Sequence, residues 1–129
     1  MKDKMMEIYE LLKENPVISA KCEDRIKFYT YPETAVTNKP FMIITPLDVS
    51  RPYLYASNDN LSVEFIYQID FQSHKRMDVK ELQKAARDEL KKIGFYQLSN
   101  GLDEYFEETK RYVDARRYTG ISNVYDTDY

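Results

Sequence analysis

Apolar and polar residues alternate over positions 61–73, and this alternation is the clearest pattern in the chain. Every second residue from Val63 to Phe71 is apolar, and the residues between them are mostly polar. Successive side chains of a strand point to opposite faces, so the pattern predicts a long amphipathic strand that packs one face on a helix layer. Two shorter apolar runs, at 25–31 and 40–45, predict further strands, and the second is expected to be buried on both faces.

Helical spacing of apolar residues occurs twice. Residues 3–14 place apolar side chains at intervals of three and four, which predicts a first helix. The residue before a proline is pushed out of the helical conformation, so we expect the helix to end before Pro16 and the chain to continue in extended structure. A second helix is expected to begin with Asp78 as its N-cap and to end before Gly94, a residue type favoured directly after a helix.

The remaining segments predict short strands and loops. Residues 46–60 contain two prolines and a polar cluster, which is typical of a long irregular loop. A short strand at 95–98 is expected to end in a turn at Asn100 and Gly101. Residues 104–119 then predict a long strand on the solvated outer side of the sheet.

The order of these elements predicts a single α+β domain over residues 1–119, followed by a flexible acidic tail at 120–129. We expect a mainly antiparallel sheet of about four to five strands covered by two helices. A chain of 129 residues is long enough to bury a core and too short for two domains of ordinary size.

Composition narrows the class of protein. An apolar share of 43% beside a charged share of 32% is typical of a chain that folds. The formal net charge is −3 and neither half of the chain is basic, which argues against specific nucleic-acid recognition. No apolar run approaches the roughly 20 residues of a membrane-spanning helix, so no membrane partner is expected. The single cysteine, Cys22, cannot form an intrachain disulfide, and we expect the cytoplasm as the compartment.

Tyrosine is the unusual residue type, with twelve Tyr and six Phe against no Trp. A tyrosine ring with its polar tip suits a surface that is wet in one state and covered in another, which favours protein–protein contacts. Tyrosine is also common on exposed strand faces because of its β propensity. Both interpretations stay open at this point.

The residue types that carry catalysis are sparse. His74 lies in a polar turn and is expected to be solvated, and Cys22 is expected to be a buried or incidental thiol. Glu107 and Glu108 are adjacent, so in a strand they point to opposite faces. The three glycines lie too far apart to form a phosphate-binding loop, and no metal-ligand spacing is present. We therefore expect no catalytic residue, no metal and no cofactor.

Two segments are candidates for contact with a partner protein. One is the long loop at 46–60, and the other is a basic, aromatic strand near the C-terminus. Such a strand suits either phosphate or an acidic partner, and the acidic residues beside it favour cross-strand or intersubunit ion pairs. The candidate residues are Arg51, Tyr53, Tyr55, Lys110, Arg111, Tyr112, Arg116, Arg117 and Tyr118.

The segments 27–34, 39–47 and 108–118 resemble small proteins from the structural gene cluster of long-tailed bacteriophages (siphophages) of Gram-positive hosts. These are head–tail joining, tail-completion or minor tail proteins, and the resemblance extends over roughly residues 8–120. It rests on strings of strand residues and brings no catalytic residues.

The resemblance implies a non-enzymatic structural protein at the junction of the filled capsid and the tail tube. It implies self-association into a homohexameric ring, through which DNA passes, and docking to phage connector and tail-tube proteins. The protein would then occupy the host cytoplasm during assembly and the head–tail junction of the mature virion. A small adaptor or regulatory module that binds a host protein is the alternative, and an enzyme with an unmarked site is a second one.

Overall fold

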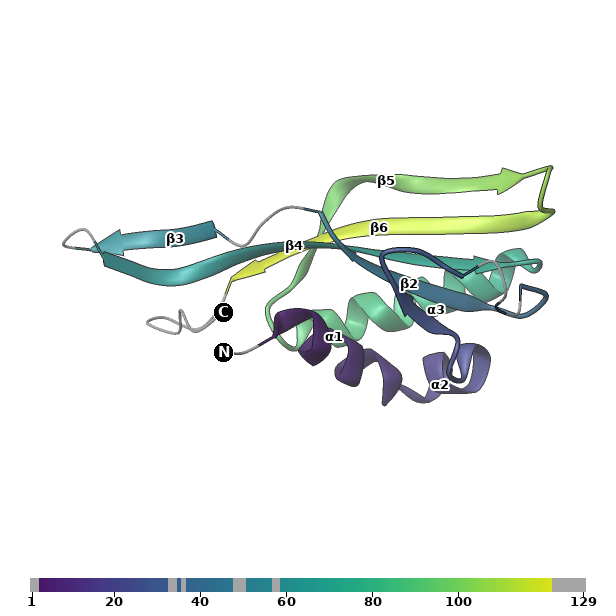
Figure 1. Cartoon of the computed structure of the whole chain (residues 1–129), viewed down its shortest axis with the longest axis horizontal. Helices are drawn as coiled ribbons and strands as arrows, with labels where there is room; N and C mark the ends of the chain where they lie inside the picture. The colour runs from purple at the N-terminus through teal and green to yellow at the C-terminus, as the bar shows by residue number, and fades with distance from the viewer. Residues whose placement is uncertain (1–2, 33–34, 36, 48–50, 57–58, 122–129) are drawn as a thin grey trace.

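Helices cover one face of a sheet in the computed structural model, which describes residues 3–32, 35, 37–47, 51–56 and 59–121 (Figure 1). In this part of the chain there are three helices and six strands. In chain order they are α1 (Lys4–Lys13), α2 (Pro16–Cys22), β1 (Ile26–Phe28), β2 (Phe41–Pro46), β3 (Arg51–Ala56), β4 (Asp59–Ser73), α3 (Arg76–Lys91), β5 (Tyr96–Phe106) and β6 (Arg111–Ile121).

The sheet is mixed. Its main path runs β1-β2-β4-β6-β5, and β3 pairs with β4 outside this path. β1 runs parallel to β2, whereas every other pair is antiparallel. A parallel pair needs a long connection between its strands, and residues 29–40 provide it. The predicted α+β class is confirmed, but the sheet is not purely antiparallel and it carries three helices instead of two.

β4 carries the long alternating pattern and lies at the centre of the core. Its apolar side chains at every second position from Val63 to Phe71 are buried against the helices. The polar side chains between them, such as that of Gln68, lie on the opposite face and are partly exposed. The strand predicted at 61–73 is therefore confirmed, and its first residue is Asp59.

β1 and β2 occupy the two shorter predicted strands, at 25–31 and 40–45. Four consecutive residues at the start of β2 are buried. Met42 belongs to the core under the helices. Phe41 lies on the other face, where the ring of Tyr31 stacks on it at a centroid distance of 3.8 Å. The predicted burial of this strand on both faces is confirmed.

The first helix is confirmed, but the extended structure predicted after it is wrong. The Asp3 side chain caps the first turn of α1. Pro16 then stands at the first position of α2, where its missing N–H costs no hydrogen bond. The Asn15 Oδ1 atom accepts hydrogen bonds from the backbone N–H groups of Val17 and Ile18. Asn15 and Pro16 therefore end one helix and begin the next.

Helix α3 begins before Asp78, at Arg76, and Lys75 is its N-cap without a side-chain capping bond. Asp78 lies in the first turn, where its carboxylate accepts hydrogen bonds from Ser73 Oγ and Lys21 Nζ. The predicted N-cap is wrong, because this carboxylate joins α3 to β4 and α2. Gly94 follows the helix with φ +80°, as predicted for that position.

The C-terminal strands differ most from expectation. The turn predicted at Asn100 and Gly101 is wrong: β5 continues through both, and the chain turns at 107–110 instead. A Cβ on Gly101 would lie 2.6 Å from the Ala115 carbonyl oxygen, so this glycine allows close approach of two strands. The single strand predicted over 104–119 is therefore a hairpin.

β6 is an inner strand, and the predicted solvated outer position is wrong. It lies between β4 and β5, with Val113, Asp114 and Ala115 buried. It continues through Gly120 to Ile121, two residues beyond the end expected for the domain. The predicted tail beyond that point, 122–129, lies outside the described residues.

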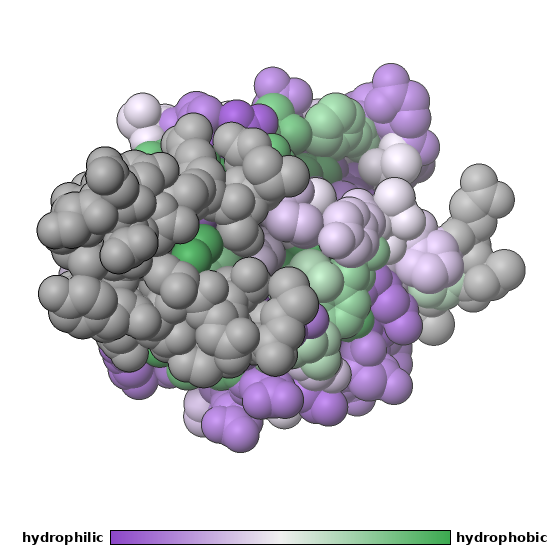
Figure 2. All heavy atoms as spheres, turned by 60° about the vertical axis from the view of Figure 1, so that its left-hand side comes forward, coloured by the Kyte–Doolittle hydropathy of each residue, from purple (hydrophilic) through white to green (hydrophobic). Residues whose placement is uncertain are grey.

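The loop predicted at 46–60 contains a strand. Residues Arg51–Ala56 form β3, which pairs with Asp59–Glu64 of β4. These two segments are called the arm below. Figure 1 shows the arm extending beyond the helices, and Figure 2, which brings this end forward, shows hydrophobic atoms among the hydrophilic ones beside it. Residues 48–50 and 57–58 lie outside the described residues.

Candidate functional site

The predicted contact residues do not form one surface. Arg111 and Arg117 lie on the sheet face opposite the helices, whereas Tyr112, Arg116 and Tyr118 lie on the helix side, because the register alternates. Arg51, Tyr53 and Tyr55 lie on β3, and their side chains are outside the described part of the structure. Lys110 lies in the turn before β6.

Tyr118 is fully buried, so its predicted place on a contact surface is wrong. Its hydroxyl donates a hydrogen bond of 2.7 Å to Gln83 Oε1 on α3. The ring fills the core between β4 and α3, and burial raises the pKa of the phenol. Tyr118, which was predicted from the sequence to contact a partner, therefore attaches α3 to the sheet.

The arginines on the opposite face interact with neighbouring strands. The Arg111 guanidinium lies over the ring of Phe41, 5.5 Å from its centroid, and its Nε donates to Gln72. Arg117 Nε donates to the side chain of Gln68 on β4. Both side chains remain partly exposed. This face therefore carries two arginines beside the Phe41 ring of β2, whereas the tyrosines predicted to accompany them, Tyr112 and Tyr118, lie on the other face.

A buried polar network joins α3 to β6, and sequence patterns did not reveal it. Gln83 Nε2 lies within hydrogen-bond distance of the carbonyl oxygens of Ile69 and Asp114 and of Asp114 Oδ1. Gln83 Oε1 accepts from Tyr118. Both ends of the Gln83 amide are therefore satisfied, as a buried amide requires.

Asp114 is the charged centre of this network, with 1% of its surface exposed. Lys80 Nζ lies 3.1 Å from its Oδ2, and Arg116 Nε lies 2.9 Å from its Oδ1. Asp103 on β5 forms ion pairs with the same two cations. The hydrogen bond that Lys80 donates to Asp103 lowers the pKa of the Asp103 carboxyl. The hydrogen bond to Asp114 raises the pKa of Arg116. The predicted cross-strand ion pair is therefore present for Arg116.

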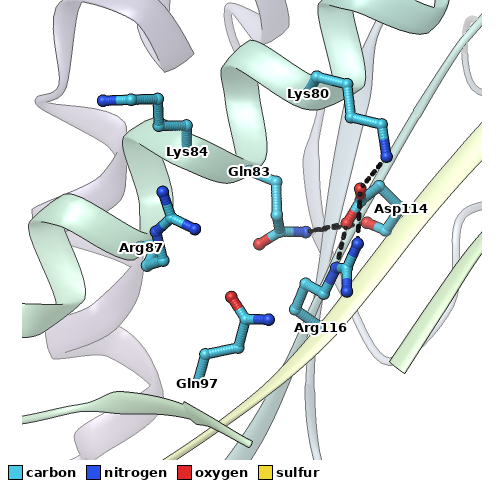
Figure 3. A pocket seen from close by; sticks show the side chains of 7 residues that line it. All are labelled: Lys80, Gln83, Lys84, Arg87, Gln97, Asp114 and Arg116. Carbon is cyan, nitrogen blue, oxygen red and sulfur yellow. Dashed lines mark hydrogen bonds and ion pairs between the residues drawn. The ribbon is translucent and has the colours of Figure 1, made fainter. Parts of the chain in front are cut away.

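Beside this network, α3 and the β5–β6 hairpin enclose a pocket of about 270 Å³, called the basic pocket (Figure 3). Three of its cations come from one side of α3, because residues three and four apart share a helix face. The strands contribute the remaining cation, one amide and one carboxylate. Its lining residues are Lys80, Gln83, Lys84, Arg87, Gln97, Asp114 and Arg116.

The cations of the basic pocket differ in how they are neutralised. Lys80 and Arg116 have Asp114 and Asp103 as partners, and Lys84 pairs with Asp88 at 3.1 Å. Arg87 forms no ion pair or hydrogen bond with the described residues, and its buried Nε atom is without a partner. The uncompensated positive charge of the basic pocket is therefore at Arg87.

The residues that could carry catalysis lie apart from the basic pocket. His74 Nδ1 lies 2.7 Å from the Lys110 carbonyl oxygen, in a contact that joins two turns. Cys22 is buried in the core, and burial raises the pKa of its thiol to about 12, which keeps it protonated and unreactive at neutral pH. Within the described residues, His, Cys, Asp and Glu form no group of three that could hold a metal ion. Among the helices of the described part of the chain, none has the length and apolar composition that crossing a membrane requires.

Asp70 is a half-buried carboxyl on the sheet face opposite the helices. Its register neighbours are Ile43 on β2 and Ala115 on β6, and both are buried. Its Oδ1 atom has no hydrogen-bond partner among the described residues. Burial favours the uncharged form and raises the pKa of Asp70 to about 6.

We expect Asp70→Asn to stabilise the fold at neutral pH by about 1–2 kcal/mol. One pKa unit corresponds to roughly 1.4 kcal/mol, and the partial exposure of this carboxyl to water reduces the full effect of its raised pKa. The native carboxyl holds its proton at pH values where the unfolded chain has lost it. Wild-type stability from this group is therefore lost as pH rises from about 4 through about 6, and the advantage of the variant grows over that range.

Urea unfolding of both proteins across this pH range measures the difference. Asp88→Asn is the control, because the hydrogen bond from Lys84 lowers the pKa of this exposed carboxyl. Removing the Asp88 charge should therefore not stabilise the fold. A difference between wild type and Asp70→Asn that stays constant with pH would contradict the assignment.

Comparison with known proteins leaves the family open. No protein-family model matches the chain, and no curated protein matches it significantly.

Proposed function

We propose that this protein is a structural component of the head–tail junction of a long-tailed bacteriophage. In this role it self-associates into a ring, six-fold as the sequence resemblance implies, and docks to connector and tail-tube proteins. It acts without catalysis, in the host cytoplasm during assembly and in the mature virion afterwards. The projecting arm is the observation that carries the proposal.

The arm is a two-stranded ribbon that extends beyond the helices in a single copy of the chain (Figure 1). Asp59–Glu64 pairs with β3, and only its last residue is also paired with β6. A two-stranded hairpin is marginally stable in water by itself, so an arm of this kind gains stability when a partner covers it. Contact with a neighbouring subunit would supply that cover.

Within the described residues β1, β3 and β5 are edge strands of the sheet, and β3 and β5 are the longer ones. Within the described residues β3 pairs only with β4, and β5 pairs only with β6. Their outer backbone N–H and C=O groups are available to another strand. Pairing of the β3 edge of one copy with the β5 edge of the next is a head-to-tail contact, and such contacts close into a ring when the rotation between copies permits.

Exposed apolar side chains lie at the base of the arm. Leu47 and Ile121 are 38% and 39% exposed. The Leu47 N–H donates to the Ile66 carbonyl oxygen, and Ile121 pairs with Glu64, so both flank the same stretch of β4. A patch of apolar and polar side chains beside a projecting ribbon suits a protein interface.

The test is the assembly state of the full chain by native mass spectrometry, alone and with the connector and tail-tube proteins of the same gene cluster. We expect a cyclic oligomer, formed alone or on addition of those proteins. Tyr53→Glu with Tyr55→Glu on β3 is expected to weaken assembly by about a hundredfold, since buried aromatic contacts dominate interface energies.

Tyr29→Glu is the matched control, because Tyr29 is 60% exposed and lies outside the arm. It should assemble as the wild type does, and circular dichroism should show that all variants are folded. A wild-type chain that stays monomeric with both partner proteins present would overturn the proposal. Equal loss of assembly in the Tyr29 variant would overturn the role of the arm.

A further inference from the structure

The basic pocket is lined by two side chains, Arg87 and Gln97, whose hydrogen-bond donors are unused among the described residues. Arg87 approaches from α3, and its terminal nitrogens point into the pocket (Figure 3). Gln97 approaches from β5 on the opposite wall, and it makes no hydrogen bond with the described residues. Between them lies the volume of about 270 Å³.

Charge balance singles out Arg87 as the group that a ligand would neutralise. The pocket and its immediate ion pairs contain four cations and three carboxylates, from Asp88, Asp103 and Asp114. Each of the other cations has a carboxylate within 4 Å, so one positive charge remains. A planar guanidinium matches the geometry of carboxylate and phosphate oxygens.

We propose that the basic pocket binds a single oxyanion, a carboxylate or phosphate group, between the Arg87 guanidinium and the Gln97 amide. The charged hydrogen bond comes from Arg87, and Gln97 donates a neutral one. Arg116 lines the same pocket, but its ion pairs with Asp114 and Asp103 already compensate its charge.

The surrounding carboxylates restrict the ligand to a discrete anionic group. Asp88 and Asp103 are both about half exposed beside the pocket. A nucleic-acid backbone presents a row of phosphates and needs a continuous basic surface, which these carboxylates interrupt. A small phosphate or carboxylate compound, or one acidic side chain presented by another protein, meets the charge requirement.

The experiment is a titration of the full chain followed by ¹⁵N NMR at constant ionic strength, with inorganic phosphate in one arm and acetate in the other. The reporters are the Arg87 Nε–H and Gln97 side-chain amide signals. We expect saturable shifts of both with at least one probe, and the stronger probe identifies the preferred oxyanion. Absence of saturable shifts with both probes overturns the proposal.

Arg87→Gln tests the guanidinium, and we expect it to weaken binding by about tenfold or more, as loss of a charged hydrogen bond does. Arg87→Lys keeps the charge without the planar fork and should bind with intermediate affinity. Lys92→Gln removes an exposed cation that pairs with Glu89 outside the pocket and should bind as the wild type does.

Two outcomes would contradict the site. Equal binding by the wild type and a folded Arg87→Gln protein, judged by its backbone spectrum, would show that the anion binds elsewhere. A short single-stranded oligonucleotide that shifts the same reporters at far lower concentration than phosphate would show that the surface takes a polyanion instead of one oxyanion.

Discussion

Asp114→Ala is expected to lower the free energy of unfolding by about 3 kcal/mol, the largest effect of a single side-chain truncation that we predict. The change removes a buried carboxylate that accepts hydrogen bonds from Lys80, Arg116 and Gln83. Both cations are about one quarter exposed, so water recovers part of their solvation and the loss falls at the lower end of the range for broken buried ion pairs.

Urea unfolding at neutral pH measures this loss. Asp114→Asn should lose less, because an amide oxygen still accepts a hydrogen bond although the charge is gone. Asp88→Ala removes an exposed ion pair on the same helix and should leave stability close to that of the wild type, because water screens exposed pairs. A loss below about 1 kcal/mol for Asp114→Ala would show that the network contributes little.

Local patterns were sufficient for the parts of the fold that depend on a single element. The alternation in β4 and the apolar spacing of α1 and α3 each describe one element packed on one core, and all three elements are present. At Asn15 and Pro16 two local rules compete. Pro16 prevents the preceding helix from continuing, yet it is also favoured at the start of a new one, and the capping oxygen of Asn15 decides the outcome.

Long-range contacts explain what the sequence could not predict. The Asn100–Gly101 pair is a strong local turn signal, but β5 must pass close to Ala115 at Gly101, and no pattern within β5 records that approach. The position of β6 inside the sheet likewise depends on β5 returning beside it. The charged residues of β6 are typical of an exposed strand, although one of them, Asp114, is buried.

The basic pocket is an assembly of distant residues. Lys80, Gln83 and Arg87 share one side of α3, where they form a polar margin beside the buried apolar side chains of the helix. Gln97 and Arg116 come from two strands whose register fixes them opposite the helix. Of the pocket residues, only Arg116 was predicted to take part in binding, and for a different surface. Without the strand register, the helix margin alone gives no reason to expect a site.

Gly120→Ala is the second large effect, with an expected loss of about 3 kcal/mol, the upper end of the usual range for overpacking a core. A Cβ at this position would lie 2.6 Å from Phe95 Cδ1, closer than real side chains approach. Phe95 is fully buried, and its ring packs against Phe65 and Tyr67, so it has little room to move. To accept the methyl group, β6 would have to shift away from Phe95, or the Phe95 ring would have to leave its place in the core.

The effect of Gly120→Ala should depend on Phe95, and this dependence separates a steric clash from the general cost of changing a glycine. In a Phe95→Leu background, itself destabilised, the added methyl group should cost about 1 kcal/mol or less, because the smaller side chain leaves space for it. Gly94→Ala is the comparison for backbone strain, since a Cβ there meets nothing within 4 Å although φ is +80°. Urea unfolding of the four-protein cycle measures the coupling. Equal costs in both backgrounds would show that the Phe95 ring is not what requires glycine at this position.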